Sequence, residues 1–406
     1  MDAFTTPLPK AWQRVRLGDI AEIIGGGTPS TQITSFWNGS INWFTPTEIG
    51  ITKYVYKSQR TITPLGLKKS SAKLLPIGTI LLTSRASIGD CAILKVVATT
   101  NQGFQSLIPL EKINNEFLYY LMLTLKNKLL KLASGSTFLE VSPNKIKNLL
   151  IPLPPLNEQI AIANILSDVD HYLCSLDALI LKKESVKKAL RIKMLNQILA
   201  SNGVEFRELG DTILSLKTGL NPRSFFKLNT PNANNYYVTI RELEDYTIKF
   251  THQTDRIDDN ALSLCLKRSN LEKDDILFSG TGTIGKVSII EKNPNNWAIK
   301  EGIYSIKPNK KIVFPRFLMF CLESSNIQND IKNKSFGGIV KSIPMNDLQQ
   351  IQIPLPPLNE QIAIANILSA LDSEIISLKN KKRQFENIKK ALNHDLMSAK
   401  IRVLKK

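Results

Sequence analysis

The sequence predicts an α+β protein in which two mixed α/β domains are separated by two long helices. These helices are expected to run antiparallel, to pair as a coiled coil and to be related by a pseudo-twofold axis. Three observations predict this architecture. The chain has 406 residues, which is more than one ordinary core accommodates. A segment of 17 residues occurs twice, and each copy opens a long stretch with a helical hydrophobic pattern.

The repeat is the most informative of these observations, because an internal repeat defines the organisation of a chain. Residues 151–167 have the sequence IPLPPLNEQIAIANILS, and residues 353–369 have the same 17 letters 202 positions later. Seventeen consecutive identities do not arise by chance. The chain is therefore expected to divide into a first domain, a helix, a second domain and a second helix, with boundaries at 1–150, 151–203, 204–352 and 353–406.

Each copy of the repeat predicts the start of a long helix. The Pro-Leu-Pro-Pro stretch is extended, and Asn157 or Asn359 follows where a helix N-cap is expected. Apolar residues then recur at alternating spacings of four and three, at Ile162, Leu166, Val169, Leu173, Leu176 and Ile180, and at Ile364, Leu368, Leu371, Ile375 and Leu378. Beyond these positions the seam shifts, with Lys183 and Lys382 on it.

About 40 residues at about 1.5 Å per residue give a helix of roughly 60 Å. Such a helix needs a long partner, and we expect the two to pair with each other. The alternative is that each is an amphipathic helix packed on its own domain.

The two domains contain short β-rich runs bounded by Gly, Ser and Asn, and each ends in a helical stretch. They differ in nearly all their sequence, whereas the helical segments match. We therefore expect the helices to share one task and the domains to perform two different ones. The net charge of +18 favours a polyanionic partner, although lysine-rich surfaces also serve solubility. Residues 11–150 hold 16 basic and 7 acidic residues, and residues 205–352 hold 20 and 17.

Several classes of protein are disfavoured. The four cysteines are scattered without CxxC spacing, which is typical of reduced thiols in a cytoplasmic protein. The three histidines are dispersed, so we expect no metal site. No apolar run approaches the roughly 20 residues of a membrane span, and the first residues lack a secretory pattern.

A search for catalytic motifs finds two near matches. Residues 280–286, GTGTIGK, match a phosphate-binding loop up to its last position, where Val287 replaces Ser or Thr. We interpret this segment as a glycine-rich hairpin. Asn221-Pro222-Arg223 lacks the second proline of the Asn/Asp-Pro-Pro-aromatic loop of adenine methyltransferases. No metalloprotease or nucleophile-elbow motif occurs, so we expect neither an active site nor a bound cofactor in this chain.

Several motifs resemble a known family. GGGTPS at 25–30, INWFTPTEI at 41–49, NQGFQSLIP at 101–109 and TGLNPR at 218–223 resemble the target-recognition domains of type I restriction-modification specificity subunits. The doubled PLPPLNEQIAIANILS resembles the central and C-terminal regions of that family, and the resemblance covers essentially the whole chain.

The resemblance implies a cytoplasmic protein that reads a bipartite, asymmetric sequence in double-stranded DNA, with one domain for each half. It implies that the helices act as a ruler and dock two modification subunits, which methylate adenine with S-adenosylmethionine. Restriction subunits would add translocation and cleavage that depend on ATP and Mg. Two different recognition domains are consistent with a target that is not palindromic.

Loop Arg, Lys, Asn and Gln side chains bond base edges, and Lys, Ser and Thr suit phosphates. In the first domain the candidates for DNA binding are Thr28, Ser30, Lys53, Arg85, Asn101 and Gln102. In the second they are Lys217, Asn221, Arg223, Arg241, Thr281, Lys286 and Lys300. Each could instead be a solvated surface or turn residue, and aromatic residues such as Trp43 and Phe104 are expected in the core.

The two identical segments contain no Lys or Arg, so we expect them to bind protein rather than DNA. The candidates for partner binding are polar residues that we expect to be exposed, Asn157, Glu158 and Gln159 with Asn359, Glu360 and Gln361. Recent duplication, or packing of the helices on each other, would also explain the identity.

Two other functions remain open. A specificity subunit of a system that fuses modification and cleavage in one polypeptide would have the same sequence features. A coiled-coil scaffold that never touches DNA would share the helices. An autonomous methyltransferase is nearly excluded by the missing motifs.

Overall fold

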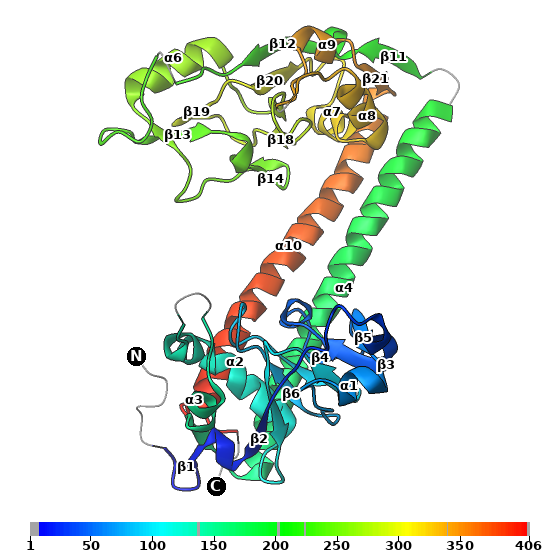
Figure 1. Cartoon of the computed structure of the whole chain (residues 1–406). Coiled ribbons are helices and arrows are strands. Elements are labelled where there is room, and N and C mark those ends of the chain that lie inside the picture. Colours follow the sequence, from blue (N-terminus) through cyan, green and yellow to red (C-terminus); the bar gives the residue numbers. More distant parts are fainter. Residues whose placement is uncertain (1–7, 136–138, 201–203, 223–224, 339, 404–406) are drawn as a thin grey trace. The chain divides into compact units, whose positions relative to one another are not determined.

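The computed structural model describes residues 8–135, 139–200, 204–222, 225–338 and 340–403 (Figure 1). The chain forms two compact units. Unit 1 comprises Met1–Asp177 with Lys381–Lys406, and unit 2 comprises Ala178–Asn380. Both boundaries lie inside long helices, because α4 (Leu156–Ala200) and α10 (Leu358–Met397) each contribute to both units.

Unit 1 contains a five-stranded sheet, a three-stranded sheet and a two-stranded ribbon. The five-stranded sheet has the order β2 (Ala21–Gly25), β9 (Gln105–Pro109), β6 (Ile80–Leu82), β7 (Cys91–Leu94) and β4 (Tyr54–Val55). The three-stranded sheet has the order β5 (Arg60–Ile62), β3 (Trp37–Phe44) and β8 (Ala98–Thr100), and the ribbon pairs β1 (Gln13–Arg16) with β10 (Leu150–Leu153). The α-helices of this domain are α1 (Pro64–Lys68), α2 (Asn115–Leu132) and α3 (Pro143–Lys147).

Unit 2 repeats this plan with different residues. Its four-stranded sheet has the order β12 (Ile213–Thr218), β20 (Ile303–Pro308), β17 (Ile276–Ser279) and β18 (Val287–Ile289). The three-stranded sheet has the order β16 (Arg256–Ile257), β13 (Asn235–Val238) and β19 (Trp297–Ile299). Two ribbons pair β14 (Leu243–Glu244) with β15 (Thr247–Ile248) and β11 (Glu205–Glu208) with β21 (Gln352–Leu355). The helices are α5 (Leu209–Thr212), α6 (Asp259–Ser269), α7 (Pro315–Leu322), α8 (Ser325–Asn333) and α9 (Met345–Gln349).

The small sheets of the two units share one topology. In unit 1, β3 pairs parallel to β8 and antiparallel to β5. In unit 2, β13 pairs parallel to β19 and antiparallel to β16. Each domain therefore has one larger sheet and one smaller sheet of mixed direction, and together with the helices these sheets agree with the predicted mixed α/β class.

The long helices contribute to the hydrophobic cores, α4 to that of unit 1 and α10 to those of both units. Ile162 and Leu166 of α4 join Phe117 of α2 and Leu396 of α10 in the core of unit 1. Leu368 of α10 lies in the core of unit 2. The apolar seam predicted from the spacing of four and three is thus buried against the domains as well as between the helices.

Within unit 1 the two helices run antiparallel: residues later in the sequence of α4 contact residues earlier in the sequence of α10. Asp170 forms an ion pair with Lys389, and Asp177 pairs with Lys382 at 2.6 Å. Between these ion pairs the rings of Tyr172 and Phe385 contact each other at 4.6 Å between centroids.

Unit 2 shows the same arrangement. Lys187 of α4 pairs with Asp372 of α10 at 2.5 Å, and Glu184 pairs with Lys379 at 2.8 Å. Asp372 lies 202 positions after Asp170, and Lys187 lies 202 positions before Lys389, so an equivalent, largely buried ion pair joins the two helices in each unit. The prediction of two mixed domains with long helices paired antiparallel is confirmed in each unit.

Among the described residues, α10 is the one helix long and apolar enough by composition to pass for a membrane span. Its acidic residues argue against a lipid-facing position, since Asp372 and Glu374 both pair with lysines of α4. We interpret the apolar composition of α10 as the seam that packs on α4 and on the domains.

Candidate nucleic-acid and partner interfaces

The glycine-rich loop at 25–30 follows β2 and lies directly against the backbone after β8. A Cβ atom on Gly26 would lie 1.9 Å from the Asn101 carbonyl oxygen, and one on Gly27 would lie 2.3 Å from the backbone nitrogen of Ala72. Only glycine allows this approach. The indole nitrogens of Trp43 and Trp37 then donate to the carbonyl oxygens of Gly27 and Ser30, at 2.8 and 3.0 Å. The loop is therefore held in one conformation.

Three of the candidates in the first domain share this loop surface. Thr28, Ser30 and Gln102 are exposed, and the Thr28 hydroxyl donates to the Gln102 side chain. Asn101 lies next to them, but its side-chain oxygen accepts from the Gly103 backbone N–H at 2.8 Å. Asn101 therefore stabilises a turn, whereas the other three present polar atoms to solvent.

Lys53 and Arg85 are already engaged within the chain. The Lys53 side chain is 11% exposed and pairs with Glu116 at 2.5 Å. Its ammonium also donates to the Tyr120 hydroxyl at 2.9 Å, which ties the loop after β3 to α2. Arg85 pairs with Glu140 at 2.8 Å. DNA contact by Lys53 would first require this cluster to open.

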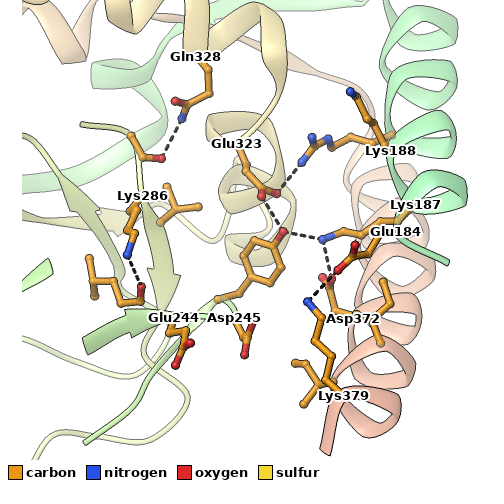
Figure 2. A pocket seen from close by; sticks show the side chains of 17 residues that line it. Glu184, Lys187, Lys188, Glu244, Asp245, Lys286, Glu323, Gln328, Asp372 and Lys379 are labelled. Carbon is orange, nitrogen blue, oxygen red and sulfur yellow. Dashed lines mark hydrogen bonds and ion pairs between the residues drawn. The ribbon is translucent and has the colours of Figure 1, made fainter. Parts of the chain in front are cut away.

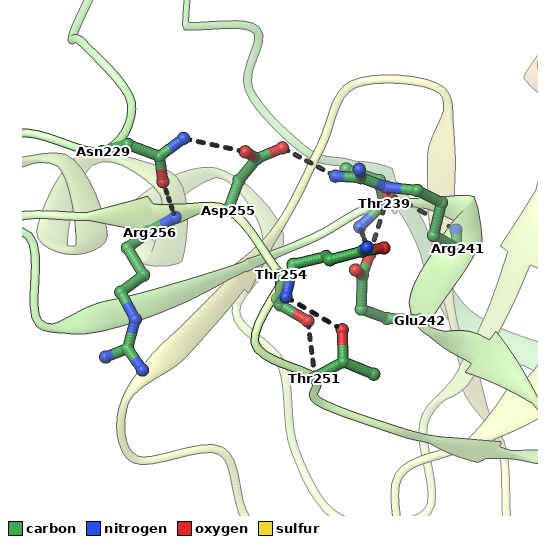
Figure 3. A network of polar contacts seen from close by, with 9 residues as sticks. Asn229, Thr239, Arg241, Glu242, Thr251, Thr254, Asp255 and Arg256 are labelled. Carbon is green, nitrogen blue, oxygen red and sulfur yellow. Dashed lines mark hydrogen bonds and ion pairs between the residues drawn. The ribbon is translucent and has the colours of Figure 1, made fainter. Parts of the chain in front are cut away.

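The candidates of the second domain are more scattered. Lys300 and Thr281 are exposed, Lys217 and Asn221 are partly buried, and Arg223 lies outside the described residues. Arg241 pairs with Asp255 at 2.8 Å, in a network that also fixes Asn229 (Figure 3).

The segment 280–286 is a hairpin between β17 and β18, which pair antiparallel. A strand rather than a helix follows Lys286, so the interpretation as a glycine-rich hairpin is confirmed. The Lys286 ammonium lies 3.4 Å from the Leu243 carbonyl oxygen and borders a cavity of about 620 Å³ in unit 2.

The side chains around this cavity form a charged cluster (Figure 2). Lys187 pairs with Asp372 and donates to the Tyr246 hydroxyl at 2.7 Å. That hydroxyl donates to Glu323 at 2.6 Å, and Glu323 pairs with Arg191 at 2.6 Å. Burial raises the pKa of the Asp372 carboxyl, and burial together with the charge of Glu323 raises the pKa of Tyr246. These groups satisfy one another, so the cluster attaches the second domain to the helix pair.

Unit 1 has an equivalent attachment. The Tyr120 hydroxyl donates to Asp170 at 2.5 Å, and Asp170 also pairs with Lys389. Burial and the hydrogen bond to Asp170 raise the pKa of Tyr120. Each domain thus presents a tyrosine hydroxyl to the helix–helix ion pair of its own unit, Tyr120 to Asp170 and Tyr246 to Lys187.

The expected exposure of the partner-binding residues is wrong for three of them. Glu158 is 2% exposed, and both of its oxygens bind Arg402, at 2.6 and 3.0 Å. The Trp12 indole also donates to Glu158, at 3.1 Å. Gln159 and Gln361 are buried as well.

The two glutamines make the same contacts in each unit. The Gln159 side chain accepts from the Asn114 backbone N–H at 2.8 Å and donates to the carbonyl oxygens of Lys112 and Pro154, at 3.1 and 2.9 Å. Gln361 accepts from the Phe314 N–H at 2.8 Å and likewise donates to two carbonyl oxygens. Both glutamines therefore fix the turn that precedes the helix of their own domain.

The identical segments do present an exposed surface, but it is largely apolar. Asn157, Asn359 and Glu360 are exposed, and the Glu360 side chain has no partner among the described residues. Beside them lie six exposed apolar side chains, three at matching positions of each copy, which are Leu156, Ile160, Ile165, Leu358, Ile362 and Ile367. All six fall outside the apolar seam that the sequence predicts, and they are not among the predicted partner-binding residues.

In the part of the chain that the structure describes, no group of three or more His, Cys, Asp and Glu side chains is placed to hold a metal ion. The free cysteines Cys91, Cys265 and Cys321 are buried, and Cys174 is exposed.

Comparison with known families places both units in one class. The type I restriction modification DNA specificity domain matches residues 9–183 and 202–387. The chain belongs to this family. The type I restriction enzyme MjaIX specificity subunit of Methanocaldococcus jannaschii is 43% identical over 167 residues, a match that spans 40% of this chain and 39% of that protein. The MjaVIII specificity subunit of the same organism is 25% identical over 423 residues, which cover 98% of this chain and 94% of that protein.

The fold has a solved counterpart in the S subunit of a type I restriction-modification system from M. genitalium. It aligns over 97% of this chain and 98% of its own, with a TM-score of 0.59 and 19% identity. This similarity shows the shared two-domain fold.

Proposed function

We propose that the chain is the specificity subunit of a type I restriction-modification system and that each unit reads one half of a bipartite sequence in double-stranded DNA. The observation that carries this proposal is the presence of two DNA specificity domains with one topology and different surfaces. The surface of unit 1 includes Thr28, Ser30 and Gln102 around a rigid loop, and that of unit 2 includes Thr281 and Lys300.

Two different reading surfaces imply a target whose halves differ. The paired helices would set the spacing between the half-sites as a ruler, because a stiff helix keeps its length while a flexible linker does not. In this division the segments 1–150 and 204–352 read DNA, and the helical segments 151–203 and 353–406 set the spacing. In this proposal the chain is a cytoplasmic protein that catalyses no reaction itself. S-adenosylmethionine, ATP and Mg act in the partner subunits.

Exchange of one domain tests the proposal. Replacing residues 16–150 by the corresponding segment of a relative, in cells that supply the modification subunit, should change one half of the methylated motif and preserve the other. Methylation-sensitive sequencing provides the readout. A motif that stays unchanged, or in which both halves change, contradicts independent reading. A complex that shows no sequence preference supports a scaffold that does not bind DNA.

We further propose that the modification subunits bind the exposed surface of each identical segment, one at each copy, with restriction subunits joining the assembled complex. The support is an apolar surface without Lys or Arg that recurs at the same positions of α4 and α10. Asn157, Asn359 and Glu360 lie on it, whereas Glu158, Gln159 and Gln361 bind within the chain.

Single charge substitutions test the docking. Ile160→Asp should remove one modification subunit in native mass spectrometry, and Ile362→Asp the other. Asp168→Asn, an exposed residue just beyond the first segment, is the matched control. Two subunits retained at undiminished affinity by both aspartate variants would contradict the proposal. The same masses distinguish a fused partner, which would carry modification and cleavage in one polypeptide.

A further inference from the structure

In the part of the chain that the structure describes, an exposed arginine of each domain lies on the face of an aromatic ring. The guanidinium carbon of Arg60 lies 3.8 Å from the ring centroid of Trp37 and 5.3 Å from that of Trp43. The guanidinium carbon of Arg256 lies 4.6 Å from the ring centroid of Tyr236. Among the described residues, neither arginine has a carboxylate partner. Both therefore differ from Arg241, whose charge is paired with Asp255 at 2.8 Å.

The two arginines occupy related places in the two small sheets. Arg60 lies on β5, opposite Trp43 of the central strand β3. Arg256 lies on β16, opposite Tyr236 of the central strand β13. Each thus sits on the strand that pairs antiparallel with the centre of its sheet, beside an aromatic residue of that central strand.

The rings beneath Arg60 are held by contacts with each other and with the loop after β2. Trp37 and Trp43 contact each other edge to face, with centroids 5.0 Å apart. Their indole nitrogens bind the loop that carries Thr28 and Ser30. Arg60 is therefore positioned next to the polar surface that forms the candidate interface of unit 1.

Arg256 is held in a comparable way. Its backbone N–H donates to the Asn229 side chain at 2.9 Å, and its guanidinium points away from the network that binds Arg241 (Figure 3). Tyr236 is stacked on Phe250 with centroids 4.3 Å apart. The guanidinium makes two long contacts of 3.4 Å, to the Asn234 carbonyl oxygen and the Tyr236 hydroxyl.

Stacking fixes the plane of a guanidinium while its N–H groups, which lie in that plane, remain able to donate. A stacked arginine loses less conformational entropy when it binds, and its fork of donors matches two adjacent acceptors. The O6 and N7 atoms of guanine present such a pair in the major groove, and Arg to guanine is the commonest specific contact.

We propose that Arg60 and Arg256 are base-reading side chains, one in each domain, and that each donates two N–H groups to a guanine in its half of the target. This inference rests on the proposed function. It assigns one specificity-determining residue to each half-site.

The test uses the full complex with wild-type chain, Arg60→Lys and Arg256→Lys. Lysine keeps the positive charge and so preserves a phosphate contact, but it lacks the planar fork. In the methylated motif, Arg60→Lys should relax one guanine position of one half-site by about tenfold or more, with the other half-site unchanged. Arg256→Lys should relax one guanine position of the other half-site. Arg16→Lys and Arg316→Lys are matched controls, because the charges of these arginines pair with Asp19 and Glu291.

Arg60→Gln and Arg256→Gln give a second readout, since glutamine suits adenine and should shift the preferred base at the same position. An unchanged motif in the Lys and Gln variants overturns the inference. So does weaker methylation at all sites with the motif intact, because that result identifies phosphate contacts. Thermal unfolding within a few degrees of wild type confirms that each variant is folded. If the wild-type complex shows no motif, the proposed function itself fails.

Discussion

Glu158 and Glu360 occupy the same position of two identical segments, but the structure predicts opposite consequences when each is changed. Glu158 is buried and holds Arg402 with both oxygens, whereas the Glu360 side chain is exposed and has no partner among the described residues. We expect Glu158→Gln to destabilise unit 1 and Glu360→Gln to have almost no effect on unit 2.

The magnitude follows from the contacts that are lost. Removing one partner of a buried ion pair costs about 3 to 5 kcal/mol. The Arg402 side chain is 36% exposed, so water can solvate it after the change. Glutamine also retains an acceptor for the Trp12 indole. We therefore expect a loss of about 2 kcal/mol, which lowers the unfolding temperature of a unit of this size by roughly 4 to 8 °C. An exposed and unpaired glutamate should change it by less than about 0.5 kcal/mol.

Calorimetry of the full chain measures the two unfolding transitions, and hydrogen exchange assigns them to the units. In Glu158→Gln, exchange should rise in peptides around Trp12 and in the C-terminal residues near Arg402. Arg402→Ala should reproduce the effect, because it breaks the same pair from the other side. Equal shifts for Glu158→Gln and Glu360→Gln, or no shift for either, would refute the reasoning.

Three further predictions concern charge, hydrogen bonding and length. Burial raises the pKa of the Asp275 carboxyl to about 6 from 3.8, so unit 2 should lose stability as pH rises between these values. Asp275→Asn should remove that loss, which amounts to at most about 3 kcal/mol at pH 8, and a variant no more stable than wild type at pH 8 would contradict this prediction. Gln159→Ala should lower the free energy of unfolding of unit 1 by about 2 to 4 kcal/mol, and Gln361→Ala that of unit 2, because each change removes the three hydrogen bonds of a buried side chain; a shift in the other unit's transition would argue against separate attachments. Insertion of four residues after Ile180 and four after Lys382 should lengthen the helix pair by about 6 Å and the spacer of the methylated motif by one or two base pairs, and an unchanged spacer would refute the ruler.

The long helices could be predicted from sequence because their signal is periodic and local. Spacings of four and three identify the buried seam, and Ile162, Leu166 and Leu368 are buried as expected. The lysines that interrupt the seam, Lys183 and Lys382, form ion pairs between the helices. Two copies of one pattern are expected to pair with each other, and the pseudo-twofold axis expected between the copies makes that pairing antiparallel.

The site could be predicted only in part, because exposure depends on residues far away in the chain. Glu158 is buried by Trp12 and Arg402, which are separated from it by 146 and 244 positions. No local pattern distinguishes it from Glu360 in an identical segment. Lys53 was predicted to contact DNA because it lies in a loop, but in the structure it forms an ion pair with Glu116 of α2, which is distant in sequence. Arg60 was not predicted, because the aromatic rings that hold it are those of Trp37 and Trp43 on another strand, β3.

The identity of the two segments has a physical explanation beyond common origin. A recent duplication would leave the following residues equally alike, but of positions 168–179 only Asp170, Ser175 and Leu176 recur 202 positions later. Asp170 recurs as Asp372, and each of these aspartates forms the helix–helix ion pair of its own unit.

Within the segment, the buried residues are also accounted for by contacts. Gln159 and Gln361 bind the same turn in each domain, and Leu166 and Leu368 fill each core. Leu156, Ile160 and Ile165 are only partly covered by the chain's own packing, at 45%, 42% and 37% exposed, and a group of large exposed apolar side chains is typical of a surface that another molecule covers. Their presence in both copies supports the proposal that one modification subunit binds at each copy.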